Sequence, residues 1–527
     1  MKRKAISVMM ATLVTIGLLA GCGGNEDAGS ESGTKTENTD QNAAGESGEK
    51  ESADTAKEDS TDEEPYTVTM VLTGTQQRDE ERIEEKINEI LEPAINMNLD
   101  LVVLPWGSSI QQLQLMLSGD EKIDCFYTDS QHALQYMNNG QIIDLTDLID
   151  QYGVNLKEMI GEYGLKSLSV GGFTIGVPVH FQETSVPAIF MRKDLVEKYN
   201  IDVSKIKEPA DLEEVFAAVK AGEPNMDMLF SNGSTNGPLY RLGLSAYDPL
   251  GSSMGVLMDP TSGDTTVTNL YESDWYKDTA NMLYNWFQEG YINKDAATES
   301  ESWSSLFKAG QVFSMITGNH PGILTEFEVS TGYEFEVADF TDVAIKKSNY
   351  YSDIIYAIAQ NSENPEKAMQ CLDYIYGSAD IMNLLNWGEE GVDYAYIDES
   401  KDIIDYPEGI TMDNVGYSFN LAWELPNGRI THLWKGADPD VNEKQEEMNQ
   451  KGVESAAFGF IFDSTGMDTQ IAALDNVYNQ YAPSLGSGTV DPEEYIPKFV
   501  ADLKAAGVDE VIAEKQKQLD AYLAQNK

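Results

Sequence analysis

The chain has 527 residues, and 41% of them are hydrophobic, which is enough for more than one folded unit and excludes a globally disordered protein. Its 89 acidic residues outnumber 35 basic ones. The resulting net charge of −54 argues against binding to nucleic acid, and against a basic patch for anionic lipid. Three cysteines cannot form a disulfide framework, and four histidines leave little room for a histidine-rich metal site, so we predict neither a metal nor a cofactor.

The N-terminus predicts export and lipidation. Basic residues at positions 2–4 precede an apolar run over 5–20, which is typical of a signal peptide and short for a membrane span. The run ends in Leu-Ala-Gly-Cys, which resembles the bacterial lipobox, in which the cysteine is acylated and becomes the first residue of the mature chain. We therefore predict a signal peptide over 1–21, and an acylated Cys22 that anchors the protein in the lipid bilayer at the extracytoplasmic face of the cell membrane. The alternative is an ordinary secretory signal with a chance cysteine.

A polar segment follows this site. Residues 23–64 contain fourteen acidic residues and three lysines, but no Leu, Ile, Val, Met or aromatic residue. Such a segment cannot bury enough apolar area to offset its ordering entropy, so residues 22–64 are predicted to be the lipidated cysteine and a disordered acidic linker. Charge repulsion should extend the linker and hold the folded part away from the membrane.

The first part of the folded region alternates between strands and helices. Buried strands are predicted over 66–72, 99–104 and 123–127, with helical patterns at 83–91 and 110–117 between them. This alternation predicts an α/β fold with a parallel, doubly wound sheet. Ligands of such sheets bind at the carboxyl ends of the strands. Those ends fall at residues 73–75, 105–108 and 128–131.

The later part of the chain is predicted to be helical as far as residue 308 and then mixed. Trp275 and Trp286 lie at helical spacing, which favours a place in the core over a place in a binding site. A long amphipathic helix is expected at the C-terminus. The remaining predicted elements are strands at 189–191, 310–318 and 354–359 and helices at 193–199 and 365–376.

The order of five sequence blocks resembles the extracellular solute-binding lipoproteins of ABC importers, in the class that contains the maltose- and oligosaccharide-binding proteins. The resemblance covers nearly all of residues 65–527. The blocks are Ile123–Ser130 with Gly140–Leu148, Gly176–Pro178 with Phe190–Leu195, Phe307–Gly318, Asn361–Met369 with Leu372–Tyr376, and the tail that begins at Gly459.

The resemblance implies a two-lobed fold like that of the periplasmic binding proteins, with doubly wound sheets, a hinge between the lobes and a ligand cleft at their interface. We assign residues 65–180 and 313–356 to the first lobe, 186–308 and 360–460 to the second, and 461–527 to a C-terminal helical block packed on the lobes. The chain is expected to cross between lobes near 179–188, 308–314 and 356–362. Cys125 and Cys371 are expected in different lobes, buried and free.

A sugar presents a flat apolar face ringed by hydroxyl groups, so aromatic side chains beside carboxylates and amides on strand-end loops are candidate ligand contacts. Trp106 and Trp387 are favoured because the Pro and Gly beside them predict exposed loops, although any tryptophan can equally belong to a core. Trp423 and Glu424 form a further aromatic–acid pair. The predicted ligand-binding residues are Trp106, Tyr127, Asp129, His180, Gln182, Glu183, Asn319, His320, Trp387 and Glu389.

Enzyme motifs are incomplete in this sequence. Gly251–Gly255 matches G-x-S-x-G, but loop sequence flanks it on both sides where a nucleophile elbow needs a strand and a helix. A calcium-loop-like run at 438–449 lacks the glycine at its sixth position and the glutamate at its twelfth. We predict no catalytic residue. Paired carboxylates for glycoside hydrolysis stay open as an alternative in so acidic a chain.

The sequence thus predicts a lipid-anchored, monomeric binding protein that captures a small polar solute, an oligosaccharide first of all, and delivers it to the permease subunits of an ABC importer. The alternatives are a membrane-tethered glycoside hydrolase, a peptide- or amino-acid-binding lipoprotein of the same fold, and an adhesin without ligand-linked closure. No nucleic-acid partner is expected.

Overall fold

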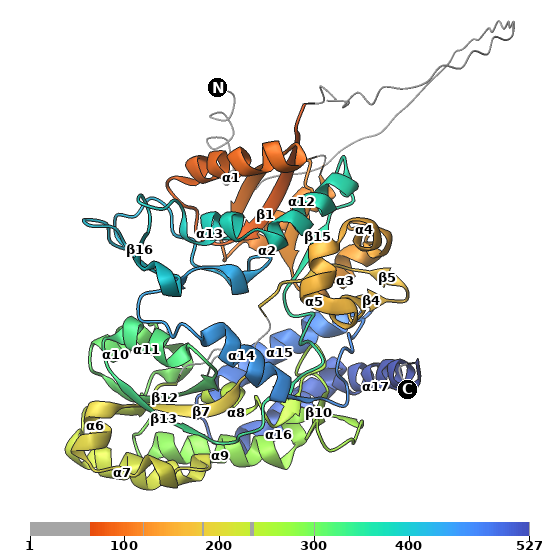
Figure 1. Cartoon of the computed structure of the whole chain (residues 1–527). Coiled ribbons are helices and arrows are strands. Elements are labelled where there is room, and N and C mark those ends of the chain that lie inside the picture. The colour runs from red at the N-terminus through yellow and green to blue at the C-terminus, as the bar shows by residue number, and fades with distance from the viewer. Residues whose placement is uncertain (1–63, 120, 182–183, 232–236, 300, 526–527) are drawn as a thin grey trace, which may run out of the picture. The chain divides into compact units, whose positions relative to one another are not determined.

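The computed structural model describes residues 64–119, 121–181, 184–231, 237–299 and 301–525 (Figure 1). The predicted signal peptide, Cys22 and the linker up to residue 63 lie outside the described residues. Within the described ranges, no helix combines the length and the apolar composition that a membrane span requires.

The first lobe is built on a five-stranded sheet in the order β2-β1-β3-β15-β6. β1 (Tyr66–Thr73) is parallel to β2 (Met97–Leu104) on one side and to β3 (Cys125–Thr128) on the other. Because β1 lies between its two successors, the chain winds in both directions, as predicted. β15 (Ile355–Ile358) and β6 (Val177–Pro178) complete the sheet, with β15 antiparallel to both of its neighbours.

Helices pack on this sheet through apolar stripes. α1 (Glu80–Ile95) buries Ile83, Ile87 and Leu91, which recur every four residues along one helix face. The other helices of the lobe are α2 (Ser109–Ser118), α3 (Ser130–Asn138), α4 (Thr146–Tyr152), α5 (Val154–Lys166), α12 (Pro365–Gly377) and α13 (Ala379–Trp387).

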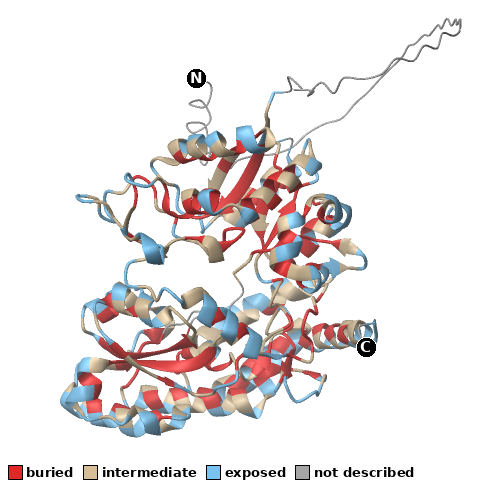
Figure 2. Cartoon of the chain, in the orientation of Figure 1, coloured by how far each residue is buried: buried red, intermediate tan, exposed pale blue. Residues whose placement is uncertain are grey.

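The second lobe has a four-stranded sheet in the order β13-β7-β12-β8. β7 (Val186–Arg192) is buried along its whole length, and Figure 2 shows the concentration of buried residues in β7 and β12. Trp286 lies in the core of this lobe and Trp275 packs against that core, which confirms their prediction as core residues. The elements around β7 are β8 (Asp227–Leu229), β12 (Val312–Asn319), β13 (Phe335–Asp339), α6 (Lys193–Lys198), α7 (Leu212–Gly222), α8 (Pro238–Leu242), α9 (Asp274–Gln288), α10 (Trp303–Lys308), α11 (Ile323–Thr331), and the small sheet of β9 (Tyr247–Asp248), β10 (Val256–Met258) and β11 (Val267–Thr268).

The C-terminal helices belong to the same core as the second lobe. α15 (Asp468–Gly486), α16 (Pro492–Ala506) and α17 (Val508–Gln525) bury apolar residues against α9 and the small sheet. The predicted helical block is therefore present, and its core contacts are with one lobe.

The lobe assignment from sequence was wrong in two places. β12 pairs with β7 and β8, and β13 pairs with β7, so residues 313–339 belong to the second lobe and not to the first. α12 and α13 share the core of β1 and β3, so the predicted placement of residues 360–434 in the second lobe fails. The reason is physical: the local pattern of a strand or helix does not specify its partner sheet.

Both thiols illustrate this error. Cys125 and Cys371 are buried and free, as predicted, but they lie in one core and not in different lobes. Correspondingly, the chain crosses between lobes in three places: between β6 and β7, at 340–354, and between Trp434 and Val441. It does not cross at 308–314 or 356–362.

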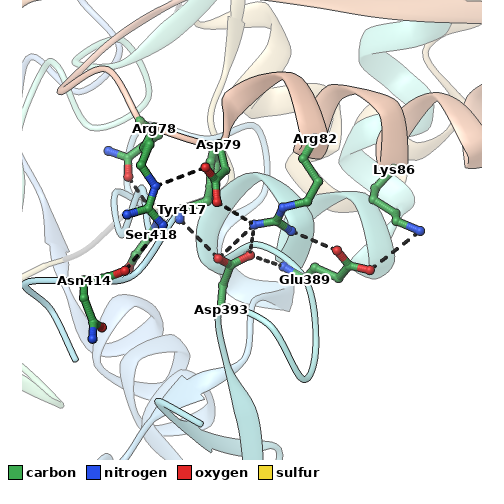
Figure 3. A network of polar contacts seen from close by, with 10 residues as sticks. Arg78, Asp79, Arg82, Lys86, Glu389, Asp393, Asn414, Tyr417 and Ser418 are labelled. Atoms are coloured by element: carbon green, nitrogen blue, oxygen red, sulfur yellow. Dashed lines mark hydrogen bonds and ion pairs between the residues drawn. The ribbon is translucent and has the colours of Figure 1, made fainter. Parts of the chain in front are cut away.

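Residues 388–434, here called the arm, extend from α13 and carry β16 (Ala395–Asp398), β17 (Ile403–Asp405) and β18 (Leu433–Trp434). An ion-pair network ties the arm to α1 (Figure 3). Arg82 Nη2 donates to both carboxylate oxygens of Asp393, at 2.9 and 2.7 Å, and Arg82 Nη1 donates to Glu389 at 2.9 Å. Asp393 also accepts from the backbone N–H groups of Tyr417 and Glu389. The arm is therefore fixed to the first lobe by charge as well as by apolar packing.

Candidate functional site

A cavity of about 330 Å³, here called the cleft cavity, lies where the lobes and their crossing segments meet. Trp423 comes from the first lobe, whereas Tyr240, Leu244 and Pro249 come from the second. The remaining lining residues belong to the crossing segments or lie directly beside them: Val179, Phe181, Ser185, Ile345, Lys347, Asn349, Tyr350, Asp353 and Ile354. A cavity with walls from two lobes and from their connections is the site that relative movement of the lobes would open or close.

The indole of Trp423 is the centre of an aromatic cluster. The Trp106 ring stacks on it with centroids 5.9 Å apart and an interplanar angle of 24°, and the Tyr127 ring meets it edge-on at 6.4 Å. Trp106 is 49% exposed, as its Pro and Gly neighbours predicted. Trp423 therefore brings together two predicted site residues, Trp106 and Tyr127. The sequence had indicated Trp423 itself only as part of an aromatic–acid pair.

Glu424 anchors the loop that presents Trp423. Its side chain is fully buried, and its Oε1 accepts from the backbone N–H of Thr73 at 2.6 Å, at the carboxyl end of β1. Tyr356 Oη donates to the Glu424 backbone carbonyl at 2.9 Å. Burial raises the pKa of Glu424 to about 8, and the Thr73 hydrogen bond opposes this only partly. Glu424 is therefore mostly protonated at neutral pH.

Polar groups face the aromatic wall across the cleft cavity. Lys347, Asn349 and Asp353 come from the second crossing segment, and Asn349 Nδ2 donates to Asp353 Oδ1 at 3.1 Å. Burial lowers the pKa of Lys347 to about 8, despite the nearby charges of Asp248 and Asp353. The cavity thus combines aromatic faces with donors and acceptors, the combination that a polyhydroxylated ligand requires.

A loop of the second lobe forms another part of the wall and is held by α17. The fully buried Lys515 donates through Nζ to the carbonyl oxygens of Ser252 at 2.7 Å and Gly255 at 2.9 Å, and also to Pro249. Burial lowers the pKa of Lys515 to about 7, with the charge of Asp248 acting against the shift. The C-terminal block therefore positions a wall of the cleft cavity.

This loop also approaches the first lobe closely. Gly251 has φ of 88°, and a Cβ there would lie 2.7 Å from Gln131 Nε2. Only glycine adopts this backbone conformation without strain and leaves room for the Gln131 side chain. The G-x-S-x-G match lies in the connection between β9 and β10, so short strands flank it where loop was predicted on both sides, and no helix follows it. Gly251 in this connection contributes to contact between the lobes.

Asp129, predicted as a ligand contact, acts as the N-cap of α3. Its Oδ1 accepts from the backbone N–H groups of Gln131 and His132, at 2.8 and 3.0 Å, and its Oδ2 lies 2.6 Å from His132 Nδ1. Burial raises the pKa of Asp129, but the His132 ring and the backbone donors outweigh burial and leave the pKa below its ordinary value. Capping occupies much of the acceptor capacity of this carboxylate.

Trp387 and Glu389 do not line the cleft cavity. Trp387 is only 7% exposed, stacks on Trp434 with centroids 5.1 Å apart, and donates from Nε1 to the His432 carbonyl at 3.0 Å. Glu389 pairs with Arg82 at 2.9 Å and lies 3.6 Å from Lys86. The inference from Gly388 to an exposed tryptophan was wrong, because the glycine serves a turn that packs against Asp393, which a Cβ would meet at 2.4 Å.

The other predicted residues lie elsewhere. His180 lines a different cavity, together with residues of α5 and of α14 (Val441–Lys451). Asn319, at the end of β12, donates to Asp339 Oδ1 at 2.8 Å, and His320 Nδ1 lies 3.1 Å from the Pro321 carbonyl oxygen. Gln182 and Glu183 lie outside the described residues. Among the residues that the structure describes, no group of three His, Cys, Asp or Glu side chains has an arrangement suited to a metal ion.

Sequence reasoning missed Tyr240, Lys347, Asn349 and Tyr350, which line the cleft cavity. Tyr350 and Tyr351 form an adjacent aromatic pair beside an amide, which is the signal that could have drawn attention to this segment. Tyr240 lies in α8 and has no comparable local signal.

The family described as bacterial extracellular solute-binding protein matches residues 74–381, more than half of the chain, and residues 456–524 match a domain of unknown function. A carbohydrate ABC transporter substrate-binding protein of Streptococcus pneumoniae is 25% identical over 84% of this chain and 87% of its own length.

Solved structures show the same fold. The N-glycan transport solute-binding protein of Streptococcus pneumoniae has a TM-score of 0.75 at 24% identity, covering 88% of this chain and 100% of its own. An HMO-binding, ABC-transporter-associated protein of Bifidobacterium longum infantis has a TM-score of 0.63 at 16% identity, covering 88% and 100%. With the two lobes and the cavity at their junction, the family match shows that this chain belongs to the bacterial extracellular solute-binding proteins.

Proposed function

We propose that the cleft cavity captures an oligosaccharide for delivery to the permease of an ABC importer. The observation that carries this proposal is the Trp423 indole, which lines the cavity while Trp106 and Tyr127 pack around it. A sugar ring stacks on such a surface through its apolar C–H face.

The polar side of the cavity supports the same ligand class. Lys347, Asn349 and Asp353 offer donors and acceptors for the hydroxyl groups at the rim of a sugar ring. The name of the Streptococcus pneumoniae relative, a carbohydrate transporter protein, adds support from a protein that covers most of this chain. A volume of about 330 Å³ is at the lower end for ligand cavities and suits one or two sugar rings, with further rings in solvent.

Membrane anchoring belongs to the proposal. The lipobox-like Leu-Ala-Gly-Cys sequence would place an acyl anchor at Cys22, and residues 23–64 would connect it to the lobes. A monomeric protein on such a linker would reach its permease by diffusion in two dimensions.

The test is isothermal titration of the purified protein with a panel of oligosaccharides, including mannose-containing ones, and with a matched panel of peptides. We expect a saturable sugar signal that Trp423→Ala removes, while Trp275→Ala, at a tryptophan of the second-lobe core, leaves the affinity of the folded fraction unchanged. Consumption of the sugar over time would replace the proposal with glycoside hydrolysis. Binding of peptides alone would replace the ligand class.

A further inference from the structure

Three side chains of the arm converge on one point of its small sheet. Tyr394 directly precedes β16 and Tyr396 lies within it, so the two phenol rings belong to the same face of the extended chain. His432 directly precedes β18, and its Nε2 atom is 3.2 Å from the Tyr394 hydroxyl oxygen and 3.1 Å from the Tyr396 hydroxyl oxygen. This group, here called the tyrosine–histidine cluster, is not part of the lining of the cleft cavity.

A carboxylate holds the imidazole from its other side. Asp402 Oδ1 lies 2.7 Å from His432 Nδ1, and an ionised carboxylate can only accept, so Nδ1 carries a proton. In the neutral imidazole Nε2 then has a single lone pair, and two hydroxyl groups compete for it. Both contacts are at the long end of the range for hydrogen bonds. A metal ion on that lone pair would instead take all three atoms as ligands.

The distances in the cluster suit a shared metal ion. Donor atoms about 2 Å from one ion, at tetrahedral or octahedral angles, are about 2.9–3.4 Å apart, and both measured distances fall in this range. The rings also approach from different directions, since the imidazole is inclined at 57° to the Tyr394 ring and at 65° to the Tyr396 ring, and the two phenol rings at 84° to each other. The three side chains thus meet through their polar atoms and do not stack.

The backbone around the cluster is fixed. The His432 N–H donates to Asn383 Oδ1 at 2.6 Å, and the His432 carbonyl accepts from Trp387 Nε1 at 3.0 Å. β16, which carries Tyr396, pairs with β17. Ligands that are held in place before an ion arrives lose little entropy on binding it. The His432 side chain is 12% exposed and that of Asp402 52%, so one edge of the cluster faces solvent and an ion can enter there.

The surroundings of the cluster are anionic. The charges of Glu390, Asp402 and Asp380 act on both phenol hydroxyls. Burial above all, with these charges adding to it, raises the pKa of Tyr394 and Tyr396, so an ion must be a strong Lewis acid to replace their protons. A trivalent ion meets this need, gains from the negative field and prefers hard oxygen donors. Tyrosine oxygen is the ligand of iron in some haem proteins.

We propose that the tyrosine–histidine cluster binds one ferric ion through the phenolate oxygens of Tyr394 and Tyr396 and through His432 Nε2. Asp402 keeps the imidazole oriented through Nδ1. Each bound ion displaces two phenol protons, which pass to the solvent, and the iron stays ferric. The site uses a single histidine and two phenols, and so differs from a cluster of His, Cys, Asp and Glu side chains, of which the described residues hold none. It goes beyond the cleft site and does not depend on its ligand.

The test is titration of the purified protein with ferric nitrilotriacetate at neutral pH, followed by visible absorption. Phenolate bound to ferric iron gives a charge-transfer band, which iron on surface carboxylates does not give. We expect the band to saturate at one ion per chain. Asp402→Asn should weaken binding about tenfold, since Asn tolerates the left-handed backbone there (φ of 59°) but carries no charge, and Tyr396→Phe should weaken it more. The control is Tyr406→Phe, at a tyrosine of the same arm whose ring packs on Trp434, and it should change nothing.

Four results would overturn the proposal: no saturable visible band, the same band and affinity in Tyr396→Phe, unchanged affinity in Asp402→Asn, or an equal loss in Tyr406→Phe. Thermal unfolding of each variant without iron confirms that it is folded, and Asp402→Asn, at a half-exposed side chain, carries the test should Tyr396→Phe unfold. A saturable band as described, without any oligosaccharide binding, would instead contradict the proposed function alone.

Discussion

Two tryptophan–acid pairs in the same part of the chain have opposite arrangements. In the first pair Trp387 is buried against Trp434, and Glu389 reaches outward to the cations of α1. In the second pair the acid is buried, since Glu424 is fully enclosed at the end of β1, and Trp423 lines the cleft cavity. The two pairs look alike in sequence, and only the second one presents an aromatic side chain to the cleft cavity.

The difference shows how a binding loop is positioned. A buried acid that accepts a hydrogen bond from Thr73 fixes the backbone of the loop, and the neighbouring indole, half-buried beside Trp106 and Tyr127, still lines the cleft cavity. In the first pair the buried Trp387 packs against Trp434 of the arm, and its aromatic face is not available to a ligand. In each pair one residue is the buried anchor and the other is less buried, and the roles of the tryptophan and the acid are exchanged.

The largest effect is expected for Trp387→Ala. Removing a buried indole that stacks on Trp434 and bonds to the His432 carbonyl should lower the free energy of unfolding by about 3–5 kcal/mol. Chemical denaturation measures this loss, and titration of the folded fraction should show unchanged oligosaccharide affinity. Lost affinity in a stable variant would mean that Trp387 contacts the ligand after all.

Trp423→Ala should instead lower the affinity for the ligand and leave the stability nearly unchanged. We expect oligosaccharide affinity to fall by about 2–4 kcal/mol, because the stacking surface is lost, while the free energy of unfolding changes by less than about 1 kcal/mol. Calorimetry and denaturation on the same preparation measure both quantities. If stability falls as far as in Trp387→Ala, Trp423 is a core residue and the contrast between the pairs disappears.

Much of the fold followed from sequence pattern, because β1, β2 and β3 are short segments rich in apolar and β-branched residues that are separated by amphipathic helices. The lobe membership of β12 and of α12 did not follow, because it depends on pairing with strands far away in the sequence. Likewise the exposure of Trp106 was predictable from its Pro and Gly neighbours. The burial of Trp387 depends on its contact with Trp434, which no local sequence pattern indicates.

The attachment of the arm offers a third way to test the contrast. Arg82→Ala would leave the Asp393 carboxylate, which is 1% exposed, without its cation, and should cost about 2 kcal/mol of unfolding free energy. Lys166→Ala is the control, since Lys166 is 76% exposed in its ion pair with Glu162 on α5 and should cost less than about 0.5 kcal/mol. Denaturant titration measures both. Equal costs would show that the network does not fix the arm, which carries Glu389 and the second pair.

The buried acid itself should be visible in the pH dependence of stability. The pKa of Glu424 rises from the ordinary 4.5 to about 8 in the folded protein, so between these values the native state holds a proton that the unfolded chain releases. Its contribution to stability is therefore complete below about pH 4.5 and is lost as the pH rises toward 8, with a slope of at most about 1.4 kcal/mol per pH unit. Glu424→Gln keeps an oxygen that accepts from Thr73 and cannot ionise, so its stability should fall less steeply over pH 5–8 in denaturation measured side by side with the wild type. Parallel slopes would mean that Glu424 is ionised when buried, and the anchor of Trp423 would then be an ion instead of a neutral hydrogen-bonding group.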